Sequence, residues 1–213
     1  TVDETTARSD SATPLPDVWP RSWKALATSG STGRPNIVRT TRPALTDPDL
    51  PATSFIPHTA TQLITSPLWH STAFTYGLLG LLTTHRIIIM PQFDETSFLD
   101  AVEEHRVTWT AVSPPSIRRL LRLPESDRAR RDMSSLETLL HIGGRCPEPD
   151  KRALMDWLGP ERVIEVYAGS ESNGITVARG PEWLDHPGTV GQPLSSTTIT
   201  IRRADGSAAP TGE

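Results

Sequence analysis

Hydrophobic and polar positions follow a regular pattern through the middle of the chain. Between residues 86 and 167, short β-branched runs alternate with segments whose apolar side chains recur at helical spacing. The pattern predicts strands at 86–90, 108–112, 136–142 and 163–167, separated by helices at 97–105, 115–121 and 149–158. Because strands that alternate with helices usually lie parallel, the expected fold is α/β, with a mostly parallel sheet flanked by helices.

The rest of the chain is less regular. Further strands are expected at 23–28, 62–66, 174–178 and 197–203, with a strand-like run at 36–41 and a helix that ends at about residue 82. Prolines interrupt residues 43–61, where no element is predicted. Residues 1–21 are polar and contain three prolines, which predicts a linker or flexible lead-in before one folded unit at 22–213.

Composition and charge argue against several classes of protein. The formal net charge is −4 and no basic block occurs, which disfavours a nucleic-acid partner or an anionic membrane surface. The most apolar stretch, residues 74–90, is broken by polar and charged side chains, so we expect no membrane span. A single cysteine, Cys146, leaves no internal disulfide and fits a reducing compartment. We therefore expect a cytoplasmic protein.

The first candidate for chemistry is a loop of small residues after the strand expected at 23–28. Small side chains let backbone N–H groups turn inward around an anion, while hydroxyls and a guanidinium add donors. The spacing is neither that of the Walker P-loop nor that of the dinucleotide fingerprint G-x-G-x-x-G. The residue types alone leave a flexible surface turn as an alternative to a phosphate-binding loop. The loop consists of Thr28, Ser29, Gly30, Ser31, Thr32, Gly33 and Arg34.

Two further loops follow predicted strands, and ligands of open α/β sheets bind beyond the carboxyl ends of the strands. One loop offers a flat backbone floor for a planar base, and the other offers an aromatic ring, a hydroxyl and a carboxylate suited to Mg²⁺. Taken singly, they are also compatible with an ordinary turn and an exposed glutamate. Their residues are Gly143, Gly144, Arg145 and Cys146 in the first loop, and Tyr167, Ala168, Ser170 and Glu171 in the second.

The run from Ser170 to Gly174 also comes close to the G-x-S-x-G elbow of α/β-hydrolases, with Gly143 and Gly144 upstream as a candidate oxyanion loop. Its first position is serine, however, where the elbow needs glycine for a close backbone contact. The acid and histidine that follow, Asp185 and His186, lie too near the elbow for the usual triad order. The sequence therefore disfavours a hydrolase.

Taken together and in order, three segments resemble the adenylate-forming enzymes, a superfamily of acyl-CoA synthetases, luciferases and peptide-synthetase adenylation domains. The segments are Thr-Ser-Gly-Ser-Thr-Gly-Arg-Pro at 28–35, the glycine pair at 143–144 and Tyr-Ala-Gly-Ser-Glu at 167–171. The chain is most similar to an acyl-CoA synthetase, over residues 22–213. It departs from the usual pattern at Asn36, where the family has lysine, at Arg145 and Cys146, and at Ala168 and Ser170, where the family has glycine and threonine.

The resemblance implies a reaction and a set of roles. A carboxylic acid would be activated with ATP to an acyl-adenylate, pyrophosphate would leave, and coenzyme A would take the acyl group as a thioester. Tyr167 and the glycine pair would hold adenine, Ser170 would contact the α-phosphate, and Glu171 would bind Mg²⁺. Glu171, Thr28 and Arg34 would carry catalysis. The family's Pro-Leu-x-His segment lies beside the acyl group, which assigns Trp69, His70 and Phe74 to the acid pocket.

Two alternatives remain open. In the first, the chain is part of an adenylation domain and the acyl acceptor is the thiol of a carrier protein. In the second, the chain is not part of an enzyme but a non-catalytic fragment that binds a nucleotide. The resemblance also implies that residues 22–213 are part of a larger N-terminal domain, without its start, its end or the small C-terminal domain, so we expect this portion alone to be inactive. The acid itself is not identified, and fatty-acid and natural-product metabolism both fit.

Overall fold

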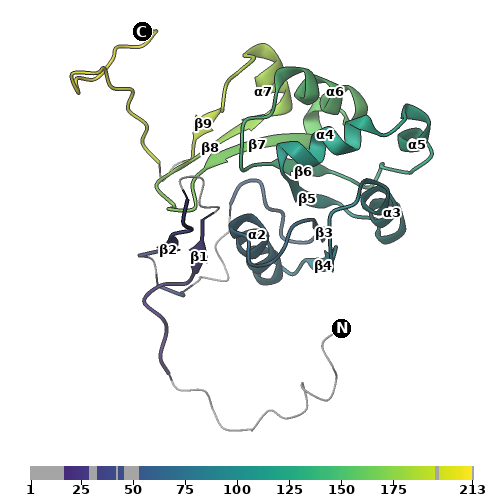
Figure 1. The fold of residues 1–213 in the computed structure, drawn as a ribbon, viewed down its shortest axis with the longest axis horizontal. Helices are drawn as coiled ribbons and strands as arrows, with labels where there is room; N and C mark the ends of the chain where they lie inside the picture. Colours follow the sequence, from purple (N-terminus) through teal and green to yellow (C-terminus); the bar gives the residue numbers. More distant parts are fainter. Residues whose placement is uncertain (1–16, 29–32, 42, 46–52, 195–196, 213) are drawn as a thin grey trace.

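The computed structural model describes residues 17–28, 33–41, 43–45, 53–194 and 197–212 (Figure 1). Within them, the main sheet has seven strands in the order β4-β3-β5-β6-β7-β8-β9. The first five strands pair in parallel, and β8 and β9 add to the edge in antiparallel pairing. Their bounds are β3 Thr61–Ile64, β4 Arg86–Ile89, β5 Trp109–Val112, β6 Thr138–His141, β7 Val163–Ala168, β8 Ile175–Arg179 and β9 Gln192–Pro193.

Helices connect the parallel strands and cover both faces of the sheet (Figure 1). Helices α3, α4 and α6 pack on one face, while α2 and residues 53–57 pack on the other. The sequence prediction of a mostly parallel α/β sheet flanked by helices is therefore confirmed. The helices are α2 Ser71–Leu82, α3 Glu95–His105, α4 Pro114–Arg122, α5 Glu125–Ala129, α6 Glu148–Leu158 and α7 Gly180–Asp185, with a 3₁₀ turn η1 at Pro160–Arg162.

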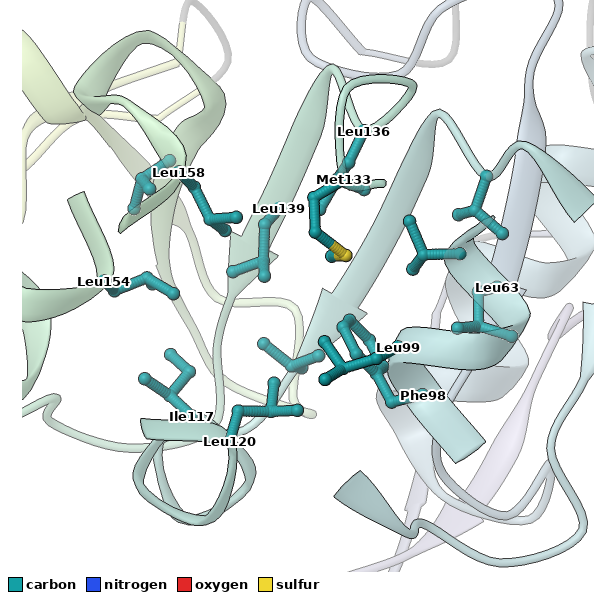
Figure 2. Close-up of a cluster of buried hydrophobic side chains, with 14 of the residues drawn as sticks. Leu63, Phe98, Leu99, Ile117, Leu120, Met133, Leu136, Leu139, Leu154 and Leu158 are labelled. Atoms are coloured by element: carbon teal, nitrogen blue, oxygen red, sulfur yellow. The ribbon is translucent and has the colours of Figure 1, made fainter. Parts of the chain in front are cut away.

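The larger core lies between the sheet and helices α3, α4 and α6 (Figure 2). Phe98 and Leu99 of α3, Ile117 of α4 and Leu154 of α6 are all at most 2% exposed. These positions are the apolar stripes that the sequence pattern identified. Complete burial of such side chains stabilises the fold by roughly 1.5–3 kcal/mol each.

A separate two-stranded hairpin precedes the main sheet. Strand β1, Ala25–Ala27, pairs antiparallel with β2, Ile37–Arg39. The backbone N–H of Thr28 donates to the carbonyl of Asn36 at 2.9 Å, which closes the base of the loop between the strands. The predicted strand–loop–strand arrangement is thus present, and the loop's centre lies outside the described residues.

The chain after residue 194 differs from the sequence prediction. The strand expected at 197–203 is wrong, since the segment contains only an isolated bridge from Arg202 to Ala208. Ile199 and Ile201 remain 49% and 63% exposed, and among the described residues no strand of the main sheet pairs with them. The pattern also missed the short elements α5, α7 and β9. Within the described residues, no helix has the length and apolar character needed to cross a membrane.

Candidate functional site

A cleft of about 1030 Å³ opens beyond the carboxyl ends of β6 and β7. One wall is formed by the loops that follow these strands, and the other by the β1–β2 hairpin together with the first turns of α2. Parallel strands end at the same edge of a sheet, so segments far apart in the chain meet here. The predicted residues that line the cleft are Thr28, His70, Gly143, Gly144, Arg145, Cys146, Tyr167, Ala168, Ser170 and Glu171.

The glycine pair forms an open part of the cleft floor. Gly143 has φ of +92°, a backbone conformation that favours glycine. A Cβ added to Gly143 or Gly144 would meet no atom of the described residues within 4 Å, so their side chains leave the space above this backbone open for a planar ligand. Cys146 lines the cleft but is only 7% exposed and belongs to the core, where burial raises the pKa of its thiol to about 11.

Tyr167 and Glu171 project from the end of β7 and the turn that follows it. Tyr167 is 64% exposed, while the preceding residues of β7 are buried. Gly169 leaves room for the Glu171 carboxylate, since a Cβ there would lie 3.0 Å from Oε2 of Glu171. The site thus presents an aromatic ring, the hydroxyl of Ser170 and a carboxylate within one short segment.

The donor set fits a magnesium ion that arrives with phosphates. No group of three or more histidine, cysteine, aspartate or glutamate side chains that could hold a metal is found among the described residues. Glu171 would supply one carboxylate oxygen to such an ion, and substrate phosphates and water would complete the coordination. Mg²⁺ is commonly bound in this way in phosphate-transferring sites.

The structure describes only part of the predicted phosphate loop. Thr28 lines the cleft, and its Oγ1 accepts a hydrogen bond from the backbone N–H of Asn36 at 3.1 Å. Gly33 and Arg34 are exposed and are not part of the cleft lining. The remaining predicted donors, Ser29, Gly30, Ser31 and Thr32, lie outside the described residues.

Of the three residues assigned to the acid pocket, only His70 lines the cleft. It is also the N-cap of α2, since its Nδ1 accepts a hydrogen bond from the backbone N–H of Thr72 at 3.3 Å. Trp69 is 72% exposed and does not line the cleft. Phe74 also lies outside the lining and stacks on Trp23, with 6.1 Å between ring centroids. Trp23, which sequence reasoning did not assign, presents the aromatic surface here instead.

A buried charge cluster below the cleft was missed by sequence reasoning. Lys151 of α6 donates a hydrogen bond to Oε2 of Glu165 on β7, and Glu165 also lines the cleft. Nε2 of His141 on β6 lies 3.9 Å from the same oxygen. Burial, with a smaller effect from the charge of Lys151, lowers the pKa of His141 to about 3. The sequence did contain one signal for the burial of Lys151. This lysine lies three residues before Leu154, on the apolar stripe of the predicted helix.

The hairpin wall also contains a lysine that the sequence did not single out. Lys24 is 8% exposed and lines the cleft. Its Nζ donates to Oγ of Ser71 at 3.4 Å and to Oγ1 of Thr75 at 3.2 Å. Burial lowers the pKa of this ammonium. Residues 188–190, to which the sequence analysis gave no role, also line the cleft.

Comparison with known proteins identifies the family. The family model described as AMP-binding enzyme matches residues 9–213. An acyl-CoA ligase, ppsA, of Aspergillus oryzae is 30% identical over 145 residues, which cover 65% of this chain and 25% of the ligase. An acetyl-coenzyme A synthetase of Chlorobaculum tepidum is 28% identical over 201 residues, which cover 85% of this chain and 29% of the synthetase. The chain thus spans about a quarter to a third of these relatives.

Solved structures show the same fold. The N-terminal domain of FACL13 from Mycobacterium tuberculosis superimposes with a TM-score of 0.78 at 22% identity, over 97% of this chain and 52% of that one. The o-succinylbenzoate coenzyme A synthetase MenE of Bacillus subtilis, solved in complex with AMP, gives a TM-score of 0.68 at 21% identity, over 89% of this chain and 38% of that one. The chain belongs to the family of AMP-binding enzymes, and so to the adenylate-forming superfamily.

Proposed function

We propose that the protein containing this chain activates a carboxylic acid with ATP, forming an acyl-adenylate and releasing pyrophosphate. The observation that carries the proposal is the composition of one cleft. Thr28, the glycine pair at 143–144, Tyr167 and Glu171 come from separate parts of the sequence and line the same space. Family membership and the named ligase activities of the relatives support the same reaction class.

The residues divide into a base-binding part and a phosphate-binding part. Tyr167 would stack on adenine above the open glycine floor, a contact worth about 1–3 kcal/mol in stacking sites. Ser170 would donate to the α-phosphate, and Thr28 would hold the phosphate loop at its base through its bonds to Asn36. Arg34 remains a proposed phosphate contact because it is the cation of the predicted loop, although it is exposed and does not line the cleft.

In the chemical step, an oxygen of the acid's carboxylate bonds to the α-phosphorus, and the bond from that phosphorus to the bridging oxygen of the β-phosphate breaks. Pyrophosphate leaves with the electron pair of the broken bond. Glu171 is the residue proposed to hold Mg²⁺, which when bound would offset the charge on the phosphates. Fixed charges and donors of this kind lower the barrier chiefly by electrostatic stabilisation.

We further propose that coenzyme A accepts the acyl group. Its thiolate would attack the acyl carbon, and AMP would leave. The named activities of the curated relatives support this acceptor.

The test is ATP–pyrophosphate exchange by the full-length protein with a panel of carboxylic acids, with and without coenzyme A. We expect exchange that depends on one class of acid, and a thioester when coenzyme A is added. Glu171→Gln should reduce exchange by about a hundredfold or more, as loss of a transition-state contact commonly does. Glu137→Gln is the matched control, because Glu137 is exposed and lies outside the cleft. Equal rates in the two variants would remove the role given to Glu171.

A further inference from the structure

Lys24 is a buried ammonium with unused hydrogen-bonding capacity. A lysine ammonium has three N–H donors. Two of them reach the hydroxyls of Ser71 and Thr75, and within the described residues the third has no acceptor. The ring of Trp23 lies 4.8 Å from Nζ and shields one side of the charge. All four residues line the cleft, which places the ammonium at the cleft wall.

The charge of Lys24 is not balanced by a carboxylate in the part of the chain that the structure describes. Two of the three glutamates that line the cleft have other partners: Glu165 is paired with Lys151, and Glu148 with Arg152. The third, Glu171, follows β7, and no ion pair joins it to Lys24 within the described residues. A buried charge without a counter-charge is unfavourable, and the lowered pKa of Lys24 reflects this cost. An anion that entered the cleft would relieve it.

The neighbouring hydroxyls favour the same ligand. The oxygens of Ser71 and Thr75 accept from Lys24, so their own O–H protons are available to donate. Ser71 is the first residue of α2, where the positive end of the helix dipole also favours an anion. Two hydroxyls and one ammonium therefore converge as donors, which suits a carboxylate.

The position of Lys24 separates it from the phosphate loop. Lys24 and Thr28 flank β1, and the four residue steps from one to the other extend about 13 Å. The acid's reacting carboxylate belongs at the Thr28 end, where the phosphates are expected. We propose that Lys24, Ser71 and Thr75 form a subsite for a second carboxylate, so that the substrate is a dicarboxylic acid. This inference rests on the proposed function.

The experiment compares straight-chain monocarboxylic and dicarboxylic acids of matched length in ATP–pyrophosphate exchange by the full-length protein. We expect kcat/KM to be higher for the dicarboxylic acid of each pair. Lys24→Met keeps most of the length of the side chain and removes its charge, and it should lower the ratio of the two kcat/KM values by about tenfold to about a hundredfold. Lys24→Arg should restore part of the ratio. The ratio is independent of the fraction of folded enzyme, so a loss of stability does not affect it.

Arg21→Met is the matched control, because it removes a cation three residues away that is exposed and outside the cleft. It should leave the ratio as in the parent protein. Exchange that is equal for the two kinds of acid, or a ratio that Lys24→Met does not change, overturns the subsite and leaves the proposed function standing.

A protein that shows no exchange with any acid contradicts the proposed function, and calorimetric titration then decides on the subsite by itself. Binding of a dicarboxylic acid that Lys24→Met weakens supports the subsite. Absent binding overturns it. A variant that weakens the binding of inorganic pyrophosphate alone also overturns it, because Lys24 would then belong to the phosphate site.

Discussion

Gly191 shows how one residue positions part of the cleft wall. Its φ is +80°, and a Cβ at this position would lie 1.9 Å from the carbonyl oxygen of Val177. The close approach holds the segment 188–190 against β8, where its residues line the cleft. The glycine is therefore required both for its backbone conformation and for its lack of a side chain.

We expect Gly191→Ala to lower the free energy of unfolding by about 2–4 kcal/mol, because strain and a backbone clash act together. Gly206→Ala is the control, since Gly206 has φ of +85° and a Cβ there meets no atom within 4 Å. It should cost only about 1–2 kcal/mol, the price of the left-handed conformation. Urea denaturation of the three proteins measures both changes, and equal losses would show that the contact with Val177 is unimportant.

Tyr167 permits a second test at the level of one side chain. Replacement by alanine should raise the dissociation constant of ATP by about fivefold to about a hundredfold, the range expected for loss of one base–aromatic stack. Tyr167→Phe keeps the ring and should bind ATP nearly as well as the parent. Calorimetry with the full-length protein checks both. If phenylalanine and alanine weakened binding equally, the hydroxyl and not the ring would be the contact.

At the scale of elements, two strands and a helix meet in the cluster of His141, Lys151 and Glu165. These residues come from β6, α6 and β7, and the cluster connects the helix to the strands whose ends form the cleft. The ammonium of Lys151 also lies 4.5 Å from the ring of Trp183 on α7. Both ring nitrogens of His141 lack a hydrogen-bond partner in the described structure, so its neutral form is strongly preferred.

The cluster predicts a specific loss of stability in acid. The pKa of His141 falls from 6.5 to about 3 on folding, so between these values the unfolded chain binds a proton that the folded chain does not. The free energy of unfolding is therefore at its full value above about pH 6.5. It falls as the pH drops toward 3, by up to about 1.4 kcal/mol per pH unit. Urea denaturation across this range measures the slope.

His141→Gln should make that slope shallower, because the residue that takes up the proton is gone. The same change at exposed His58 is the control for loss of a histidine as such. An unchanged slope in His141→Gln would show that His141 is not the source of the acid sensitivity.

For the whole molecule, the alternation of strands and helices between residues 86 and 167 was predictable because local pattern and tertiary burial agree there. Val163 to Val166, for example, are apolar or β-branched except for Glu165, and all are buried in β7. The segment 197–203 has a similar local pattern, yet its isoleucines stay exposed for want of a neighbouring strand. A strand needs a partner, and the partner is not encoded in the segment itself.

The loops of the cleft were predictable for a different reason. Gly143 and Tyr167 follow predicted parallel strands, and topology alone places such positions at one edge. Lys24 and Lys151 were not found, because a lysine is ordinarily exposed and only the assembled fold buries these two. The two buried lysines of the site are thus the residues whose position the local sequence predicts least well.

The two ends of β1 serve different parts of the cleft, since Lys24 stands at one end and Thr28 at the other. A strand paired along its length is a stiff support, so a ligand that fixes one end also limits the movement of the other. An acid held at Lys24 and a nucleotide held near Thr28 would therefore bind cooperatively, each raising the affinity of the other by the same factor. The hairpin would act as the thermodynamic link between the two substrates.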